Sequence, residues 1–427
     1  MNSLKKIIPA FFIKIASPIY HFSLAFLAGI FYWFPSRKIF LIGVTGTKGK
    51  TTTIEIINAI LEEAGEKTAL SSSLRFKIGK ETRKNDKKMT MPGRFFIQRF
   101  LRQAVRANCQ YAIIEITSEG ASQYRHTFLS LNAMVFTNLA PEHIESHGSF
   151  ENYRKAKLKI FKTLTWSPKR PRIIVVNEDD PNGRYFLDFR VEEKKVYGLN
   201  LAQPYKIKGS GLEFSFAGEK IISPLSGEFN LMNILASIVL ARVIHIDIGT
   251  IKKALEKFSG VEGRVERIAL EKENLLHSKQ DFSVIVDYAH TPDSLEKIYE
   301  VFQSSKRICV LGSCGGGRDK WKRPELGRIA SNHCDEIILT NEDPYDEDPK
   351  EIIKDIASGI REDKDYEIVM DRGEAIKKAV VRAKTGDTVI ITGKGSEPWL
   401  MGANGTKIPW SDREMAREAI ANKLIAY

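Results

Sequence analysis

Cysteine is scarce in this sequence, and acidic residues are outnumbered by basic ones. The four cysteines, Cys109, Cys309, Cys314 and Cys334, lie without a C-x-x-C spacing in 427 residues. This argues against a disulfide framework or a zinc cluster and favours a reducing cytoplasm. Lys and Arg number 65 against 53 Asp and Glu, a net charge of +12. The surplus suits nucleotide phosphates, nucleic acid or an anionic membrane, without choosing among them.

Low-complexity segments and internal repeats are also missing. With 43% apolar and 28% charged residues, the composition excludes a disordered or collagen-like chain. The length predicts about two or three domains. No dedicated nucleic-acid-binding module is visible, so we expect no nucleic-acid partner.

The first apolar segment, residues 15–34, contains no Lys, Arg, Asp or Glu. It is long enough to span a bilayer, which takes about 20 residues. It ends in four aromatic residues, 31–34, followed by Arg37 and Lys38, a pattern typical of a membrane interface. A cleaved signal peptide is rejected because a nucleotide-binding motif follows closely. A spanning helix, an interfacial helix and a helical hairpin packed on the protein remain alternatives, with membrane contact through residues 7–34 in the first two.

Beyond this segment, buried-type strands alternate with helical stretches. Strands are predicted at 39–44, 111–116, 133–139 and 172–177, and again at 282–289, 307–312, 336–341, 366–370 and 387–393. Helices are predicted at 51–65 and 229–244. Such alternation predicts an α/β fold with parallel sheets: a P-loop central domain and a Rossmann-like C-terminal domain.

Smaller features mark the organisation of the chain. Residues 196–222 suggest a small β-meander, and the polar, basic stretch 77–88 suggests an exposed loop or hairpin. The pattern breaks at 258–263, where a domain boundary is expected. We therefore predict an N-terminal segment 1–38, a central ATP-binding domain 39–259 and a C-terminal domain 260–427, with a hinge at 259–263.

The strongest motif is GVTGTKGKTT at 43–52, between a strand and a helix as a P-loop requires. Its glycines let backbone N–H groups face phosphate oxygens, and the helix N-terminus adds positive potential. Lys50 would reach the β- and γ-phosphates, and Thr51 or Thr52 would hold Mg²⁺. The predicted nucleotide-binding residues here are Gly46, Thr47, Lys48, Gly49, Lys50, Thr51 and Thr52.

Two further groups of polar residues follow strand ends. Glu115 and His143 offer a carboxylate and an imidazole for Mg²⁺ or Mn²⁺. In the last third, segments 287–294, 312–324 and 393–398 each follow a strand. The middle one combines a glycine-rich turn with basic residues and suits an anion.

Taken together, these motifs resemble the Mur ligase family over residues 39–425. Within it they are most similar to the branch that joins a diamino acid to UDP-N-acetylmuramoyl-L-alanyl-D-glutamate, with ATP cleaved to ADP and phosphate. This resemblance implies a role in peptidoglycan precursor synthesis in the cytoplasm, at the inner face of the membrane if residues 7–34 make contact. The implied partners are the UDP-linked peptide and a free amino acid.

The resemblance also implies roles for individual residues. Thr51, Glu115, His143 and Lys157 would bind Mg²⁺, with Lys157 carbamylated. Arg264 would approach the phosphates, making Lys50, Lys157, His143 and Arg264 the catalytic set. Asn233, Asp287 and His290 would lie near the nucleotide. The implied substrate-binding residues are Thr90, Ser118, Arg125, Arg318, Asp343, Tyr345, Gly393 and Glu397.

Some residues depart from the family's pattern. Lys48 stands where Asn is usual, and Glu119 and Ser396 each stand where His is usual. Diaminopimelate-adding relatives carry Asp-Asn-Pro-Arg where this chain has residues 342–345, Glu-Asp-Pro-Tyr. Tyr345 cannot form a bidentate ion pair with a carboxylate, so lysine, ornithine or another amino acid is an alternative.

The start of the chain departs further. Residues 1–38 cannot build the family's usual UDP-binding domain. Two other substrates are therefore alternatives to the UDP-linked peptide: a lipid-linked muropeptide, or another glutamyl substrate as in folylpolyglutamate synthase. A further alternative is that the chain is an ATP-binding scaffold without ligase activity. The expected chemistry is acyl-phosphate formation followed by attack of an amine.

Overall fold

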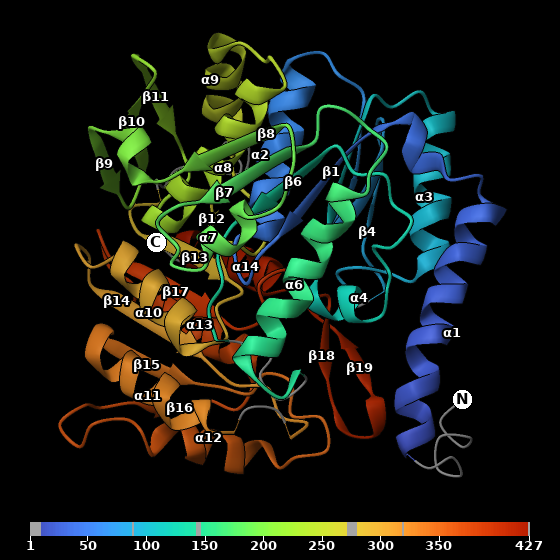
Figure 1. Cartoon of the computed structure of the whole chain (residues 1–427). Helices are drawn as coiled ribbons and strands as arrows, with labels where there is room; N and C mark the ends of the chain where they lie inside the picture. The colour runs from blue at the N-terminus through green and yellow to red at the C-terminus, as the bar shows by residue number, and fades with distance from the viewer. Residues whose placement is uncertain (1–9, 88, 142–146, 271–279, 318–319, 426–427) are drawn as a thin grey trace. The chain divides into compact units, whose positions relative to one another are not determined.

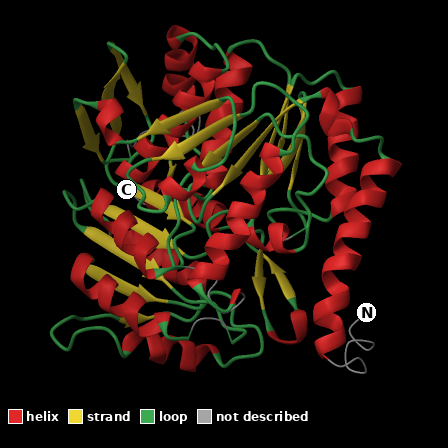
Figure 2. Cartoon of the chain, in the orientation of Figure 1, coloured by secondary structure: helices red, strands yellow, loops and turns green. Residues whose placement is uncertain are grey.

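The computed structural model describes residues 10–87, 89–141, 147–270, 280–317 and 320–425. The chain divides into two compact units. The first runs from the N-terminus to Phe258, and the second from Ser259 to the C-terminus; residues 207–211 and 224–227 group with the second. Each unit is built on its own largely parallel sheet (Figures 1 and 2).

The first unit holds an eight-stranded sheet in the order β4-β3-β2-β5-β1-β6-β7-β8. Pairing is parallel from β2 to β8, and only the β2-β3-β4 edge is antiparallel. The strands are β1 (Phe40–Thr45), β2 (Thr68–Ser71), β3 (Arg75–Ile78), β4 (Glu81–Lys84), β5 (Tyr111–Glu115), β6 (Ala133–Phe136), β7 (Ile173–Asn177) and β8 (Glu193–Tyr197). The predicted stretch 77–88 thus contributes to a hairpin.

Helices cover this sheet because its central strands are apolar on both faces. The helices of the first unit are α1 (Ala10–Phe31), η2 (Pro35–Lys38), α2 (Lys50–Glu63), α3 (Arg94–Arg106), α4 (Ser118–Ser122), α6 (Phe150–Thr165), α7 (Gly183–Leu187), η3 (Leu199–Ala202), α8 (Glu228–Val243) and α9 (Ile248–Lys257). The predicted meander is a three-stranded sheet, β9 (Tyr205–Lys208), β10 (Gly211–Phe216) and β11 (Glu219–Ser223).

In the described part of the N-terminal segment, α1 lies beside α3 and is followed by the short helix η2 (Figure 1). No helix in the described part of the chain is long and apolar enough to cross a membrane.

The second unit holds a six-stranded sheet in the order β12-β13-β17-β14-β15-β16, parallel except for β12. Its strands are β12 (Glu266–Ile268), β13 (Ser283–Asp287), β14 (Arg307–Leu311), β15 (Glu336–Leu339), β16 (Glu367–Ile368) and β17 (Thr388–Thr392), with a separate hairpin of β18 (Trp399–Met401) and β19 (Lys407–Pro409). Its helices are α10 (Pro292–Val301), α11 (Lys322–His333), α12 (Pro349–Ala357), α13 (Arg372–Arg382), η5 (Ala403–Gly405) and α14 (Asp412–Ile425). The expected α/β fold class, a parallel-sheet P-loop domain and a second α/β domain, is confirmed.

The expectation drawn from cysteine spacing needs one correction. Cys309 and Cys334 form a disulfide, with their Cα atoms 6.0 Å apart. Cys309 lies in β14 and Cys334 follows α11, the crossover that leads back to the neighbouring parallel strand β15. A search for short spacings misses such a pair because the fold, and not the local sequence, brings the two residues together.

Candidate active site

The P-loop connects β1 to α2 and packs closely against neighbouring elements. At Gly46, a Cβ atom would lie 1.9 Å from Thr137 Oγ1. At Gly49, which caps α2 with φ of 79°, it would lie 2.2 Å from Asn233 Oδ1. Only glycine fits at these positions, so the loop's backbone is held tightly at the end of β1.

The chain after β6 fixes the rim of the loop. Thr47 N donates to Asn138 O at 2.8 Å, and Lys48 N donates to Asn138 Oδ1 at 2.9 Å. The Thr47 hydroxyl lies 3.0 Å from the Tyr153 hydroxyl of α6. These contacts from β6 and α6 hold the loop at the carboxyl end of the sheet, where ligands bind in open α/β folds.

Two lysine ammonium groups meet at one carbonyl oxygen of the loop. Lys50 Nζ donates to Gly46 O at 3.1 Å and to Thr47 O at 2.8 Å. Lys157 Nζ, from α6, donates to the same Gly46 O at 2.6 Å, and its side chain is only 1% exposed. Lys50 has no carboxylate partner among the described residues, so its ammonium group suits a phosphate oxygen at the loop.

Thr51, Glu115 and Ser73 form a second cluster beside the loop. The Thr51 hydroxyl donates to Glu115 Oε1 at 3.1 Å and lies 2.8 Å from Ser73 Oγ. Ser73 N donates to Glu115 Oε2 at 2.6 Å, and Glu115 is buried. Hydroxyl and carboxylate oxygens are ligands that suit Mg²⁺.

The donor set of this cluster fits a cation shared with phosphate. Among the residues the structure describes, no three His, Cys, Asp or Glu side chains converge on one point. A Mg²⁺ ion here would take its remaining ligands from phosphate and water, as this ion commonly does. Ser73 was missed by sequence reasoning; its one signal is its place just after the carboxyl end of β2.

Of the other residues predicted near the bound ligands, some lie close to the start of α2 and some lie outside the described part of the chain. Thr52 is buried at the start of α2. Asn233 lies beneath Gly49, where its amide oxygen accepts from the Thr53 hydroxyl at 3.3 Å and its Nδ2 donates to Asn230 Oδ1 at 3.2 Å. His143 and Arg318 lie outside the described residues.

Three predicted substrate-binding residues occur on two adjoining segments. Ser118 begins α4, and its hydroxyl lies 3.1 Å from His147 Nε2. Arg125 donates to Met91 O, next to Thr90, and to Gln123 Oε1 at 2.7 Å. Burial lowers the pKa of Arg125. Residues 90–91 and the segment around α4 thus form one neighbourhood.

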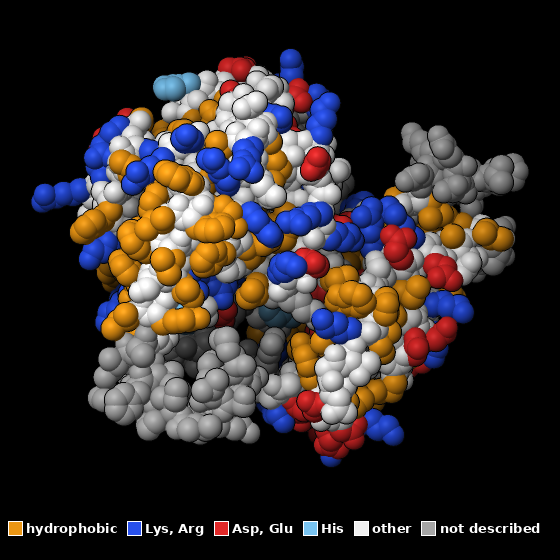
Figure 3. Space-filling view, turned by 90° about the vertical axis from the view of Figure 1, so that its right-hand side faces the viewer, with side chains coloured by type: hydrophobic (Ala, Val, Ile, Leu, Met, Phe, Trp, Pro, Cys, Tyr) orange, Lys and Arg blue, Asp and Glu red, His pale blue; other side chains and the backbone are white. Residues whose placement is uncertain are grey.

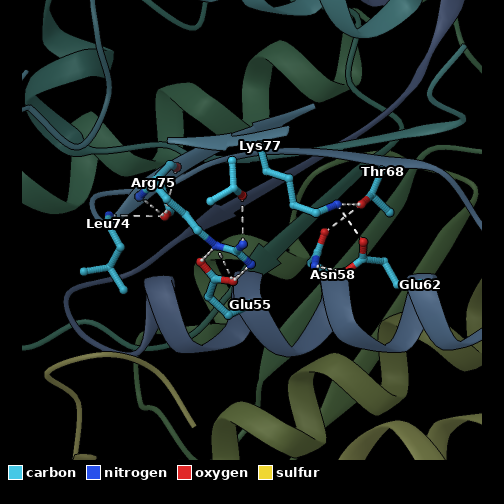
Figure 4. A network of polar contacts seen from close by, with 9 residues as sticks. Glu55, Asn58, Glu62, Thr68, Leu74, Arg75 and Lys77 are labelled. Atoms are coloured by element: carbon cyan, nitrogen blue, oxygen red, sulfur yellow. Dashed lines mark hydrogen bonds and ion pairs between the residues drawn. The ribbon is translucent and has the colours of Figure 1, made fainter. Parts of the chain in front are cut away.

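A charged network joins α2 to the β3 strand and supports the cluster around Glu115 (Figure 4). Arg75 forms a bidentate ion pair with Glu55, with Nε 3.0 Å from Oε1 and Nη2 2.5 Å from Oε2. Lys77 pairs with Glu62 at 2.7 Å and donates to the Thr68 hydroxyl at 2.9 Å. Since Arg75 is two residues from Ser73, this network fixes the turn that contacts Glu115.

In the second unit, predicted residues gather after β13. Asp287 accepts from Val265 N and Ala289 N, both at 2.7 Å. The Arg264 guanidinium lies over the Tyr288 ring, 4.2 Å from its centroid. His290 Nδ1 lies 2.9 Å from Tyr288 O. Asp287 therefore orders the backbone directly after Arg264 and directly after Tyr288.

A buried charge cluster follows β15 and β17. Lys394 Nζ donates to Asp343 Oδ2 at 2.8 Å and to Glu397 Oε2 at 2.6 Å. Burial lowers the pKa of Lys394, but Glu397, Asp343 and Glu342 more than offset this and raise it. Glu397 Oε1 also accepts from the Tyr288 hydroxyl at 3.1 Å. Sequence reasoning named Asp343 and Glu397 but missed Lys394, which holds them together.

Glu342 is buried beside this cluster. Burial raises its pKa to about 7, although Arg372 and Lys394 act to lower it. Gly393, with φ of 108°, passes so close that a Cβ atom there would lie 2.2 Å from Glu342 Oε2. Gly393 therefore fits its position because it lacks a side chain.

Curated relatives of this chain are named as UDP-N-acetylmuramoyl-peptide ligases. The UDP-N-acetylmuramoyl-L-alanyl-D-glutamate--2,6-diaminopimelate ligase of Syntrophomonas wolfei is 35% identical over 416 residues, covering 94% of this chain and 82% of that protein. The protein of the same name from Synechocystis is 38% identical, covering 92% and 78%. The chain belongs to the Mur ligase family.

Family models and solved structures agree with this assignment. The Mur ligase middle domain matches residues 44–241, and the Mur ligase glutamate ligase domain matches residues 263–395. A solved UDP-N-acetylmuramoyl-L-alanyl-D-glutamate--2,6-diaminopimelate ligase is 25% identical, with a TM-score of 0.62 over 90% of this chain and 79% of that one. Mycobacterium tuberculosis folylpolyglutamate synthase shares the fold, with a TM-score of 0.66 at 15% identity over 89% of this chain and 96% of that one.

This Mur ligase has an unusual residue at the predicted amino-acid site. Tyr345 adopts a positive φ of 52°, and its N–H donates to Met401 O at 3.2 Å. Its ring packs over Gly316 of the glycine-rich turn, where a Cβ atom would lie 3.2 Å from Tyr345 Cδ2. The side chain therefore contacts the loop that was predicted to bind an anion.

Proposed function

We propose that this Mur ligase uses ATP to join an amino acid to UDP-N-acetylmuramoyl-L-alanyl-D-glutamate, in the synthesis of peptidoglycan precursors. The observation that carries the proposal is the position of Lys50, hydrogen-bonded to Gly46 O and Thr47 O, beside the Thr51–Glu115 pair. A cation and a cation-binding oxygen pair at one helix N-terminus suit a nucleoside triphosphate.

The first step is activation of the substrate carboxylate. A carboxylate oxygen attacks the γ-phosphorus, a new C–O–P linkage forms, and the bond to the β-phosphate oxygen breaks to release ADP. Lys50 and the loop N–H groups stabilise the charge that develops on the phosphoryl oxygens. Mg²⁺ held by Thr51 and Glu115, with His143 and a carbamylated Lys157 as further ligands, would supply charge neutralisation.

The second step forms the amide. The amine attacks the acyl carbon, inorganic phosphate leaves with the electrons of the C–O bond, and the nitrogen loses a proton. Exclusion of water protects the acyl phosphate from hydrolysis. Positioning of both substrates contributes much of the rate. We assign Thr90, Ser118 and Arg125 to the UDP-linked substrate, and the segment around Gly393 and Glu397 to the amine.

We propose that residues 39–259 form the nucleotide-binding domain and residues 260–427 the domain that brings the amine. Arg264, Asp287 and His290 would approach the nucleotide from the second domain. Cytoplasmic ATP and UDP-linked precursor make the cytoplasm the site of reaction, and residues 7–34 would contact the inner face of the membrane.

Carbamylation of Lys157 is part of the proposal. The neutral amine would add to CO₂, form an N–C bond and release a proton, which changes a buried cation into an anion. We expect Lys157→Ala to lower turnover about 100-fold. Added acetate, a small carboxylate, should restore part of the activity, whereas Lys155→Ala on the exposed side of α6 should need no rescue. Acetate without effect, together with full activity in CO₂-free buffer, would contradict carbamylation.

The deciding test is ATP-dependent phosphate release by the purified full chain. The assay contains Mg²⁺, bicarbonate and the UDP-linked dipeptide, with meso-diaminopimelate, lysine and ornithine tried singly and products identified by mass. Turnover with one of these amino acids supports the proposal. Nucleotide binding without turnover on any of them would refute it.

A further inference from the structure

The outward face of α1 carries bulky apolar side chains while small residues face the protein. Ala25 and Ala28 are buried, and Gly29 packs so closely that a Cβ atom there would lie 2.5 Å from the Phe34 ring. The other side exposes the large apolar residues Ile19, Tyr20, Leu27, Ile30 and Phe31. Phe22 and Phe26 lie at its edge, where they are partly exposed and their rings also contact Phe128. A surface helix normally shows the opposite arrangement.

Trp33 is held outward at the end of this helix. It is 78% exposed and adopts a positive φ of 59°, a conformation that favours glycine. Phe34 N donates to Gly29 O at 2.8 Å, which closes the helix across this strained residue. Exposure and strain both oppose a tryptophan here, and a contact outside the folded chain would stabilise its ring.

A basic pocket opens beside Trp33. It has a volume of about 370 Å³ and is lined by Phe31 at the end of α1, by Tyr32 and Trp33 just after it, and by Arg99, Arg102, Gln103 and Arg106 from α3. Among the described residues, none of the three arginines forms an ion pair with a carboxylate. Their guanidinium groups are thus available to a phosphate oxygen at the edge of the apolar face.

Charge of one sign distinguishes this surface. Residues 1–54 and 87–114, which include α1 and α3, contain no Asp or Glu. Figure 3, which faces the α1 side, shows hydrophobic side chains gathered next to Lys and Arg side chains. A second copy of the chain paired symmetrically would bring the arginine pockets against each other, which costs energy. An anionic lipid surface matches both the apolar and the basic parts.

We infer that α1 and the arginine pocket of α3 dock the protein on an anionic lipid bilayer, with α1 lying in the interface and a lipid phosphate bound by Arg99, Arg102 and Arg106. This inference rests on the proposed membrane contact of residues 7–34 and gives it a surface and a lipid class. Vesicle binding requires no ligase turnover, so absence of turnover would refute the proposed reaction and leave docking standing, and absence of vesicle binding would remove the membrane contact and leave the reaction standing.

The docking face adjoins the proposed substrate segment. The Phe22 ring lies 6.1 Å from Tyr124 and 5.1 Å from Phe128. Arg94 donates to Gln123 O and contacts His21 of α1. Docking through α1 therefore brings the segment that carries Arg125 close to the lipid headgroups.

Flotation of the full chain with phosphatidylcholine vesicles, with and without phosphatidylglycerol, tests the inference. We expect binding only with phosphatidylglycerol, and weaker binding as salt rises. The variant R99Q/R102Q/R106Q should bind about 100-fold more weakly. The variant K206Q/K208Q/K253Q, which removes three exposed charges elsewhere, should bind like the wild type.

Trp33→Gly separates docking from a structural role. Glycine adopts a positive φ without strain, so the melting temperature should stay equal or rise, while vesicle binding falls about tenfold. Trp166, also 78% exposed, gives the matched control: Trp166→Ala should leave binding unchanged. The inference would be overturned if all variants bound equally or if the protein did not bind phosphatidylglycerol vesicles. It would also be overturned if soluble glycerol phosphate displaced the protein, or if Trp33 proved to mediate a dimer in place of vesicle binding.

Discussion

The parallel strands of both units end in charged side chains, but the two clusters are neutralised differently. In the first unit, Lys50 donates to two backbone carbonyls and has no carboxylate partner among the described residues. In the second, Lys394 is held between Asp343 and Glu397. A cation that lacks a counter-ion attracts phosphate, whereas one already paired stabilises its own fold.

The difference explains why the first unit suits ATP and the second suits positioning. Phosphate oxygens would supply the counter-charge for Lys50. Around Lys394, a further anion would compete with two carboxylates already in place. The Asp343 side chain is 6% exposed and that of Glu397 is 42% exposed, so an incoming ammonium group would meet Glu397 before Asp343.

The largest effects are expected from replacing Lys50 and Lys394, which tests whether the two clusters differ in how their charge is neutralised. Lys50→Met should lower ATP-dependent phosphate release about 10³-fold, because a cation that stabilises the transferred phosphoryl group is lost, with little change in urea unfolding. Lys394→Met should instead lower the free energy of unfolding, because two carboxylates lose their cation. Equal loss of stability in both variants would contradict the distinction.

Asp412 tests how far the second unit depends on internal pairing. Arg372 contacts it with Nε 2.8 Å from Oδ1 and Nη2 2.7 Å from Oδ2, and both side chains are buried. Asp412→Asn should lower the free energy of unfolding by about 3 kcal/mol, because a buried guanidinium loses its counter-ion. The double variant R372M/D412L should recover part of that loss in urea titrations; a single variant as stable as wild type would argue that the pair contributes nothing.

Glu115→Gln sharpens the assignment of the first cluster. The amide retains the shape but loses the charge that a divalent cation prefers, so the Mg²⁺ concentration for half-maximal turnover should rise about 100-fold. Glu119→Gln, on the exposed side of α4, is the control. An unchanged Mg²⁺ requirement would remove Glu115 from the metal site.

The smallest expected effect concerns the pH dependence of stability. Because the folded pKa of Glu342 is about 7, above its ordinary value, the folded protein holds a proton there that the unfolded chain releases. Stability therefore falls as pH rises from about 4.5 to about 7, and the penalty is complete above that range. Glu342→Gln should lose this dependence. Its free energy of unfolding, relative to that of the wild type, should therefore be about 1 kcal/mol higher at pH 8 than at pH 6. Parallel unfolding curves at the two pH values would refute the assignment.

Much of the architecture was predictable from local pattern. Apolar runs at β1, β5, β6 and β7, each bounded by turn residues, predicted the parallel sheet because strands buried on both faces are apolar throughout. The P-loop was predictable because its glycines, lysine and threonines are contiguous in sequence. The Cys309–Cys334 disulfide and the roles of Ser73 and Lys394 were not, because their partners are distant in sequence.

The sequence by itself determined the α/β class, the position of the nucleotide loop and the family, since these depend on periodicity and on short motifs. Only the tertiary structure decided which charges are neutralised and which face of α1 is exposed. Lys50 and Lys157 are 107 positions apart and meet because α6 passes beside the loop that follows β1. Charge balance depends on such distances in space, which the linear order of residues does not specify.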